Sequence, residues 1–250
     1  MRLLVISDIH SNYDALKTVL ENEKYDKALF LGDLVDYGPE PAESFDLLKE
    51  NADYFIMGNH DASFAYGVDC NCSQEMHDLS DYTLENITKK FLDKNSLNFI
   101  RGWKNQIQIQ LDNKIIYATH GSPYNNLYEY VNGQRGEEIY KDDRMKAYDY
   151  VLLGHTHYPM MIKNFVINPG SVGQPRDRDK RSSYAVIDTD KESIEFKRKK
   201  YDVDKFLSKL NDRMDNKTYF LSLKEVYIPE KADQAINEIN DIDLKLGPFK

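Results

Sequence analysis

Five short polar segments of this chain carry residue types that bind catalytic metal ions. Each follows a run of apolar residues, and together they hold five of the six histidines, which scattered surface histidines would not do. Carboxylate oxygens, amide oxygens and imidazole nitrogens suit Mn²⁺, Fe or Zn²⁺ better than a thiolate-rich structural zinc site. The segments are Asp8-Ile9-His10, Gly32-Asp33-Leu34-Val35-Asp36, Gly58-Asn59-His60-Asp61, His120-Gly121 and Gly154-His155-Thr156-His157.

The charges of these segments favour a phosphate substrate. Two divalent ions would bring four positive charges, and Asp8 and Asp33 would return two negative ones, so the site would remain positive. A pair of ions about 3.5–4 Å apart can hold both the attacking and the leaving oxygen of an in-line displacement at phosphorus. We therefore predict a dinuclear site for hydrolysis of a phosphate ester.

The elements that position these segments alternate between strand and helix in the first half of the chain. Apolar runs predict strands over 3–7, 27–31 and 53–57, and apolar residues at helical spacing predict helices over 13–23 and 41–50. This is the rhythm of a partly parallel sheet, in which ligands bind at the carboxyl ends of the strands. An extended backbone at Asp8-Ile9-His10 and at His155-Thr156-His157 would send both polar side chains to one side.

The second half adds a further β-region. We predict helices over 74–92, 95–101 and 134–146, and strands over 106–111, 114–119, 150–153, 160–163, 165–167, 183–188 and 193–199. The expected fold class is α/β: a four-layer αββα sandwich of two mixed sheets, with the metal site at the carboxyl ends of the strands.

The composition describes a chain with a sizeable core and no membrane segment. Apolar residues make up 41% of the 250 residues, mean hydropathy is −0.66, and no apolar run approaches the roughly 20 residues of a membrane helix. The N-terminus reads as a buried strand rather than a signal peptide, so we expect a cytoplasmic protein. The net charge of −9 argues against broad nucleic-acid binding but not against a small phosphorylated substrate.

The chain has two cysteines, Cys70 and Cys72, in a C-x-C pattern. In a cytoplasmic protein a structural disulfide is not expected. We interpret the pair as two loop thiols, in preference to a redox pair or a third metal site with His77.

The ordered set D-x-H, G-D-x-x-D, G-N-H-D, H-G and G-H-x-H resembles the calcineurin-like metallophosphoesterase superfamily. The segment Asn168-Pro169-Gly170-Ser171-Val172-Gly173-Gln174-Pro175-Arg176 resembles that of its small bacterial and archaeal phosphodiesterase-like branch. The resemblance implies a metallophosphoesterase domain over about residues 1–200. Residues 201–250 are expected to form a helical appendage packed on it, with a helix over 203–214, a strand-like 224–228 and a helix over 231–240.

The resemblance also implies ligands for two divalent metal ions and a hydroxide between the ions that attacks phosphorus directly. Asp33 would bridge the ions. The first would be held by Asp8, His10 and His157, and the second by Asn59, His120 and His155.

Three residues are expected to act on the substrate. His60 resembles the histidine that assists the leaving group, and Asp36 the acid that orients it. Arg176 is either a phosphate clamp or part of a solvated basic loop. Asn59 and His60 would also contact the substrate. Tyr124, Tyr128 and Tyr130 form either a substrate wall or ordinary packing.

The resemblance favours a phosphomonoester or phosphodiester of a small, possibly nucleotide-like molecule as substrate. Tyr37 stands where the protein-phosphatase branch has an arginine, which disfavours a phosphoprotein substrate. Hydrolysis of a dinucleoside polyphosphate and a non-catalytic metal-binding scaffold remain the alternatives. The metal identity and the oligomeric state stay open at this point.

Overall fold

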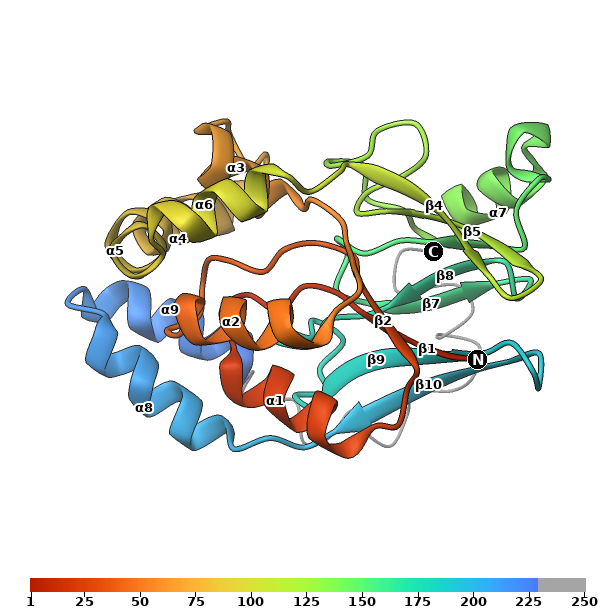
Figure 1. Cartoon of the computed structure of the whole chain (residues 1–250). Coiled ribbons are helices and arrows are strands. Elements are labelled where there is room, and N and C mark those ends of the chain that lie inside the picture. Colours follow the sequence, from red (N-terminus) through yellow and green to blue (C-terminus); the bar gives the residue numbers. More distant parts are fainter. Residues whose placement is uncertain (229–250) are drawn as a thin grey trace.

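The computed structural model describes residues 1–228, and two five-stranded sheets stacked face to face form its centre (Figure 1). In the first sheet β1 pairs in parallel with β2 and antiparallel with β9, so the sheet is mixed. Its strands, in spatial order, are β10 (Ser193–Lys199), β9 (Ser182–Asp188), β1 (Arg2–Ile6), β2 (Lys27–Phe30) and β3 (Tyr54–Phe55).

The second sheet is also mixed. Its central strand β6 pairs in parallel with β5 and β8, while β4 and β7 add antiparallel strands at the two edges. In spatial order the strands are β4 (Gln106–Leu111), β5 (Lys114–Thr119), β6 (Tyr150–Leu152), β8 (Val166–Pro169) and β7 (Pro159–Ile162).

Side chains of β1 show why the layers stack as they do. Successive residues of a strand point to opposite faces. Leu4 and Ile6 accordingly pack into the core beneath the helices α1 (Tyr13–Asn22) and α2 (Pro41–Asn51). Leu3 and Val5 pack between the two sheets, so this strand is apolar on both faces.

The outer face of the second sheet is covered by α7 (Gly133–Lys141). Ile139 of this helix shares a core with Val151 of β6 and Ile162 of β7, and Figure 1 shows α1 and α2 on the other side of the molecule. The predicted sandwich of helix, sheet, sheet and helix is confirmed. The helix expected over 134–146 ends earlier, at Lys141, because Asp142 caps a separate 3₁₀ turn, η2 (Asp143–Met145).

Helices fill the chain between β3 and β4. The helix expected over 74–92 is divided into α4 (Gln74–Thr83), a π-helical turn η1 (Leu84–Thr88) and α5 (Lys89–Phe91). It is followed by α6 (Lys94–Arg101), close to its predicted position. The sequence interpretation missed α3 (Asn59–Tyr66), which begins inside one of the polar segments.

Two more helices, α8 (Val203–Arg213) and α9 (Lys217–Tyr227), follow the last strand. The strand-like interpretation of 224–228 is wrong, because Leu223 and Tyr227 lie one helical turn apart and both pack against Tyr37 and Leu79 in a shared core. The helix expected over 231–240 lies outside the described residues. Across 1–228, no helix is both long and apolar enough to span a bilayer.

The core between the sheets makes a stability prediction. Replacing Leu29 with alanine should lower the free energy of unfolding by about 2–5 kcal/mol, because this fully buried side chain would leave a cavity. Leu221→Ala is the matched control: its side chain is 57% exposed, and we expect a change within about 0.5 kcal/mol. Urea unfolding measures both, and equal effects would contradict this assignment of the core.

Candidate metal centre

The five polar segments follow the carboxyl ends of β1, β2, β3, β5 and β6, and the two sheets bring these ends together. The side chains from both sheets converge in the interior, with exposed fractions of 3% or less. The residues of the predicted site buried in this way are Asp8, His10, Asp33, Asp36, Asn59, His60, His120, His155 and His157.

The potential ligand atoms form two groups that share one residue. In the first group, Asp8, His10, Asp33 and His157 each offer an atom within 4.8 Å of the others. In the second, Asp33 lies within the same distance of His120 and His155. Asp33 is therefore placed where a carboxylate that bridges two cations must be.

Backbone carbonyls fix the orientation of three of the imidazoles. The Nδ1 of His10 contacts the carbonyl of Val35 at 2.9 Å, and the Nδ1 of His120 contacts that of Leu31 at 2.7 Å. His157 makes the same contact with Gln174, at 2.6 Å. A carbonyl only accepts, so each Nδ1 carries a proton and each Nε2 is the ring atom that faces the centre.

Several of the central atoms are acceptors that lack a hydrogen donor. Both carboxylate oxygens of Asp8 and the Nε2 of His155 are buried without a hydrogen-bond partner. The Nε2 atoms of His10 and His157 face each other at 3.2 Å. Buried polar atoms left unpaired in this way are costly, and a cation would satisfy them together. The donor set therefore fits divalent metal ions.

The amide of Asn59 lies beside the second group. Its Oδ1 lies 3.0 Å from the Nε2 of His120, and its Nδ2 donates to the carbonyl of Cys70 at 2.8 Å. The second contact determines which end of the amide faces the centre. Asn59 is thus oriented as the second group requires.

Burial favours the uncharged form of the central carboxyl and imidazole groups. It raises the pKa of Asp8 to about 7 and lowers the pKa of His10 to about 3. Burial also holds the pKa of His155 and His157 well below the usual value, so these rings are neutral and have lone pairs for a metal.

His120 and Asp33 behave differently because they face each other. Burial opposes charge on both, but the aspartate raises the pKa of His120 to about 9 and the histidine keeps the pKa of Asp33 well below its usual range. Their closest contact is 3.2 Å, between Nε2 and Oδ2. Binding of a cation at this imidazole therefore has to displace a proton.

The side chains converge through left-handed backbone turns rather than through an extended backbone. The expectation of extended D-x-H and H-x-H segments is wrong at these residues. Positive φ is rare for residues other than glycine and is found at functional sites, where the surrounding structure compensates for its cost. The φ values are 53° at Asp8, 46° at His10, 63° at Asp33, 70° at Asp36, 68° at His155 and 62° at His157.

Two glycines allow the loops after β2 and β3 to meet. A Cβ atom on Gly58 would lie 2.1 Å from Oδ1 of Asp33, and one on Gly32 would lie 2.7 Å from the backbone of Gly58. Either contact is too short for any side chain. The absence of a side chain at these two glycines therefore permits the close approach of the loops.

Asp61 joins the same two loops, and the sequence interpretation gave it no role. Its carboxylate accepts hydrogen bonds from the backbone N–H groups of Asp33 at 2.8 Å, Leu34 at 2.9 Å and Gly58 at 3.1 Å. The contact with Gly58 is half of a capping box that starts α3. The signal in the sequence was an acidic residue three positions after a glycine.

The expected contact between Asp36 and His60 is present. Oδ2 of Asp36 lies 2.8 Å from Nδ1 of His60, and the carboxylate also accepts from Ser80 at 3.0 Å and Thr88 at 3.1 Å. Burial opposes the imidazolium form of His60, but the charges of Asp33 and Asp36 outweigh it, so the pKa of His60 is raised.

Arg176 lies near the buried cluster. It is half-buried and donates to the side chain of Gln174 at 2.9 Å. Its positive charge acts to lower the pKa of Asp8, His60 and His155. Arg178 and Lys180 of the same loop are exposed, and Arg181 pairs with Asp179.

Tyr130 and Tyr124, two of the tyrosines after His120, differ in position. The ring of Tyr130 stacks on His155 with 4.1 Å between centroids, and 42% of this residue is exposed. Tyr124 instead donates to Asp142 at 2.6 Å and is covered by arginine side chains. The ring of Tyr130 therefore lies beside the candidate metal centre, whereas the ring of Tyr124 packs against arginine side chains.

Cys70 and Cys72 form a disulfide, with 5.3 Å between their Cα atoms. The interpretation of the pair as free loop thiols is wrong. The interpretation applied to a C-x-C pair the rule for structural disulfides in cytoplasmic proteins, which does not exclude a local or reversible disulfide.

Comparisons with known proteins agree with this geometry. Residues 1–192 match the model of the calcineurin-like phosphoesterase superfamily domain. A protein of Methanocaldococcus jannaschii described as uncharacterized is 31% identical over 230 residues, which cover 83% of this chain and 91% of that protein.

Two solved structures are similar over most of their length. A metallophosphoesterase from Sphaerobacter thermophilus superposes with a TM-score of 0.73 at 27% identity, covering 90% of this chain and 98% of the other. The hypothetical protein PH1004 from Pyrococcus horikoshii gives a TM-score of 0.73 at 20% identity, with coverages of 91% and 98%. The second similarity concerns the fold alone.

The shared position of Asp33 makes a prediction about metal binding. Asp33→Asn should weaken both of two Mn²⁺ equivalents, whereas His157→Ala and His155→Ala should each weaken only one. Each loss should exceed the roughly 10–100-fold caused by removal of an outer-shell partner. Calorimetric titration of chelator-stripped protein tests this. Asp33→Asn affecting a single equivalent would contradict the bridging position.

Proposed function

Because the chain belongs to the calcineurin-like phosphoesterase superfamily, we propose that it hydrolyses a phosphomonoester or phosphodiester of a small, nucleotide-like molecule. The observation that supports this best is the pair of buried ligand groups that share Asp33. Two adjacent cations can stabilise both the attacking and the leaving oxygen of an in-line displacement at phosphorus.

The proposed ligands follow from the two groups. Asp8, His10 and His157 hold the first cation, and Asp33 contacts both. Asn59 completes the second position, together with His120 and His155. We propose Mn, Fe or Zn as the metal, since the set of oxygen and imidazole ligands suits these ions.

Bound cations would lower the pKa of a coordinated water toward neutrality and supply positive charge for the attacking and leaving oxygens. The protein's own residues provide the remaining functions. The closed interior around Asp33 and His10, 1% and 0% exposed, excludes bulk water and so strengthens electrostatic interactions with the phosphoryl group.

His60 is proposed as the proton donor to the leaving oxygen. Asp36 accepts the hydrogen of Nδ1, so the proton on Nε2 is the one available for transfer. The rings of His60 and His10 meet edge to face with 5.1 Å between centroids, which puts His60 against the first ligand group. The hydrogen bond from Nδ1 to the Asp36 carboxylate stabilises the protonated form that an acid needs.

Arg176 is proposed to bind a phosphoryl oxygen. Its hydrogen bond to Gln174 fixes one end of the guanidinium, and the remaining donors are suited to an oxyanion. Gln174 also links this loop to the C-terminal helices, because its Nε2 lies 3.4 Å from the hydroxyl of Tyr227. We propose that the helices after residue 200 pack on the domain of residues 1–200 and support the Gln174 backbone that orients His157.

Hydrolysis of generic substrates tests the activity. Chelator-stripped protein reconstituted with Mn²⁺ should hydrolyse a nitrophenyl phosphomonoester or a bis-nitrophenyl phosphodiester. Turnover should disappear with chelator and with Asp33→Asn, because both remove the proposed cations. If neither ester is hydrolysed while two equivalents of Mn²⁺ are bound, a polyphosphate-specific hydrolase or a metal-binding scaffold would be favoured instead.

The role of His60 can be separated from metal binding. His60→Ala should lower kcat by roughly 10²–10⁴-fold on an ester with an alkyl leaving group, because such a group needs a proton to depart. The loss should be much smaller with nitrophenol, which leaves readily as an anion. Asp36→Asn should show the same pattern with a weaker effect.

Metal analysis of both variants is the control, and we expect the stoichiometry of the unmodified protein. Equal losses on the two leaving groups, or loss of bound metal, would show that His60 is a structural residue or a ligand rather than an acid.

A further inference from the structure

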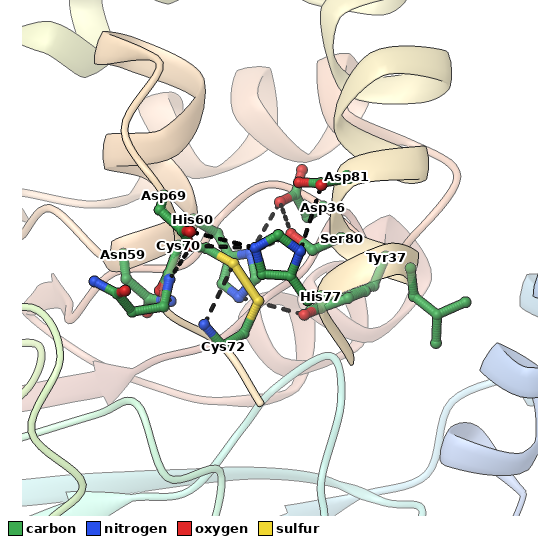
Figure 2. The surroundings of a disulfide bond; sticks show 12 residues. Asp36, Tyr37, Asn59, His60, Asp69, Cys70, Cys72, His77, Ser80 and Asp81 are labelled. Atoms are coloured by element: carbon green, nitrogen blue, oxygen red, sulfur yellow. Dashed lines mark hydrogen bonds and ion pairs between the residues drawn. A yellow bond between two sulfur atoms is a disulfide. The ribbon is translucent and has the colours of Figure 1, made fainter. Parts of the chain in front are cut away.

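The Cys70–Cys72 disulfide lies against the candidate metal centre (Figure 2). The sulfur atoms of both cysteines lie within 4.8 Å of a ring nitrogen of His60. Cys70 is buried, with an exposed fraction of 3%, whereas Cys72 is only half-buried. A disulfide this close to a residue of the candidate site is in a position to influence that site.

One hydrogen bond connects the disulfide to a proposed metal ligand. The carbonyl of Cys70 accepts from Nδ2 of Asn59 at 2.8 Å, and Oδ1 of the same amide faces Nε2 of His120 at 3.0 Å. The position of the Cys70 backbone therefore determines whether Asn59 presents its oxygen to the second metal position.

The residue between the two cysteines has an unusual backbone conformation. Asn71, between the cysteines, has a positive φ of 50°, and its N–H donates to Asp69 at 2.7 Å. Asp69 in turn faces Nε2 of His77 at 3.3 Å. A disulfide that closes only three residues removes little entropy from the unfolded chain, so its main effect is local.

We propose that the Cys70–Cys72 disulfide is a redox switch that controls binding of the second metal ion. This inference rests on the proposed function. With the disulfide closed, the Cys70 carbonyl holds Asn59 in its ligating orientation. With the disulfide open, Asn71 leaves its left-handed conformation, the carbonyl moves, and the amide loses its fixed orientation.

The opening reaction needs a dithiol reductant. A thiolate of the dithiol attacks Sγ of Cys72, the more exposed sulfur, and the bond between the cysteines breaks with release of Cys70 as thiolate. The second thiol of the reductant then attacks the mixed disulfide and releases Cys72. Two electrons and two protons pass to the cysteines, and the dithiol becomes a disulfide.

The effect is expected at one metal position only. Asn59 is proposed for the second position, whereas the imidazoles of His10 and His157 are oriented by the carbonyls of Val35 and Gln174 rather than by the Cys70 carbonyl. Loss of an outer-shell partner typically weakens metal binding by roughly 10–100-fold. We expect a loss of this size for the second Mn²⁺ equivalent on reduction, and none for the first.

The test is calorimetric titration of the stripped protein with Mn²⁺, in the oxidised form and after reduction by a dithiol that is then removed under anaerobic conditions. Mn²⁺ is used because it prefers oxygen and imidazole ligands to thiolates. The chain has only two cysteines, so thiol titration reports the state of the switch directly. We expect no free thiols before treatment and two after it.

Cys70→Ser/Cys72→Ser is the matched control. It should bind Mn²⁺ like the reduced protein and should not respond to the reductant. Two equivalents bound equally tightly in both redox states would overturn the switch and leave the proposed function intact. Failure to bind Mn²⁺ in either state would overturn the metal centre, and the switch with it.

Discussion

The structure depends on a cluster of buried acceptor atoms that have no hydrogen to share. The unpaired carboxylate of Asp8, the facing Nε2 atoms of His10 and His157 and the unpaired Nε2 of His155 would each be costly in a closed interior. Burial raises the pKa of Asp8 to about 7, which expresses the same cost. Positive charge at the centre would make this arrangement favourable, which fits the cations that the site is proposed to bind.

The two sheets serve this arrangement by supplying strand ends from both sides. β1 is apolar on both faces and pairs with β2 in parallel, so the loops after these strands leave at the same edge. Backbone groups around the cluster then hold its side chains and loops in place. Carbonyls orient the imidazoles, Asp61 accepts from N–H groups of two loops, and glycines remove the side chains that would keep those loops apart.

The sequence predicted what depends on residue type and period. Apolar runs and apolar–polar periodicity predicted the strands of the two sheets, and the position of Asp8, Asp33 and His120 after apolar runs predicted the candidate cluster. It did not predict what depends on long-range contacts. The left-handed φ of Asp8 occurs where its backbone N–H donates to the carbonyl of Gly32 in another loop, and the helix that includes residues 224–227 packs on Tyr37 and Leu79. The disulfide was missed because its effect is local and independent of compartment.

The two proposed metal positions differ in how they are supported. His10 and His157 are held by carbonyls of loops that leave the sheets, and these loops are fixed by strand pairing. In the second position, Asn59 lies at the start of α3, in the helical segment between β3 and β4, and its amide is held by the Cys70 carbonyl. A ligand held by an irregular three-residue ring is more easily released than one held by a sheet. A regulatory device that acts on one cation would therefore be effective at this second position.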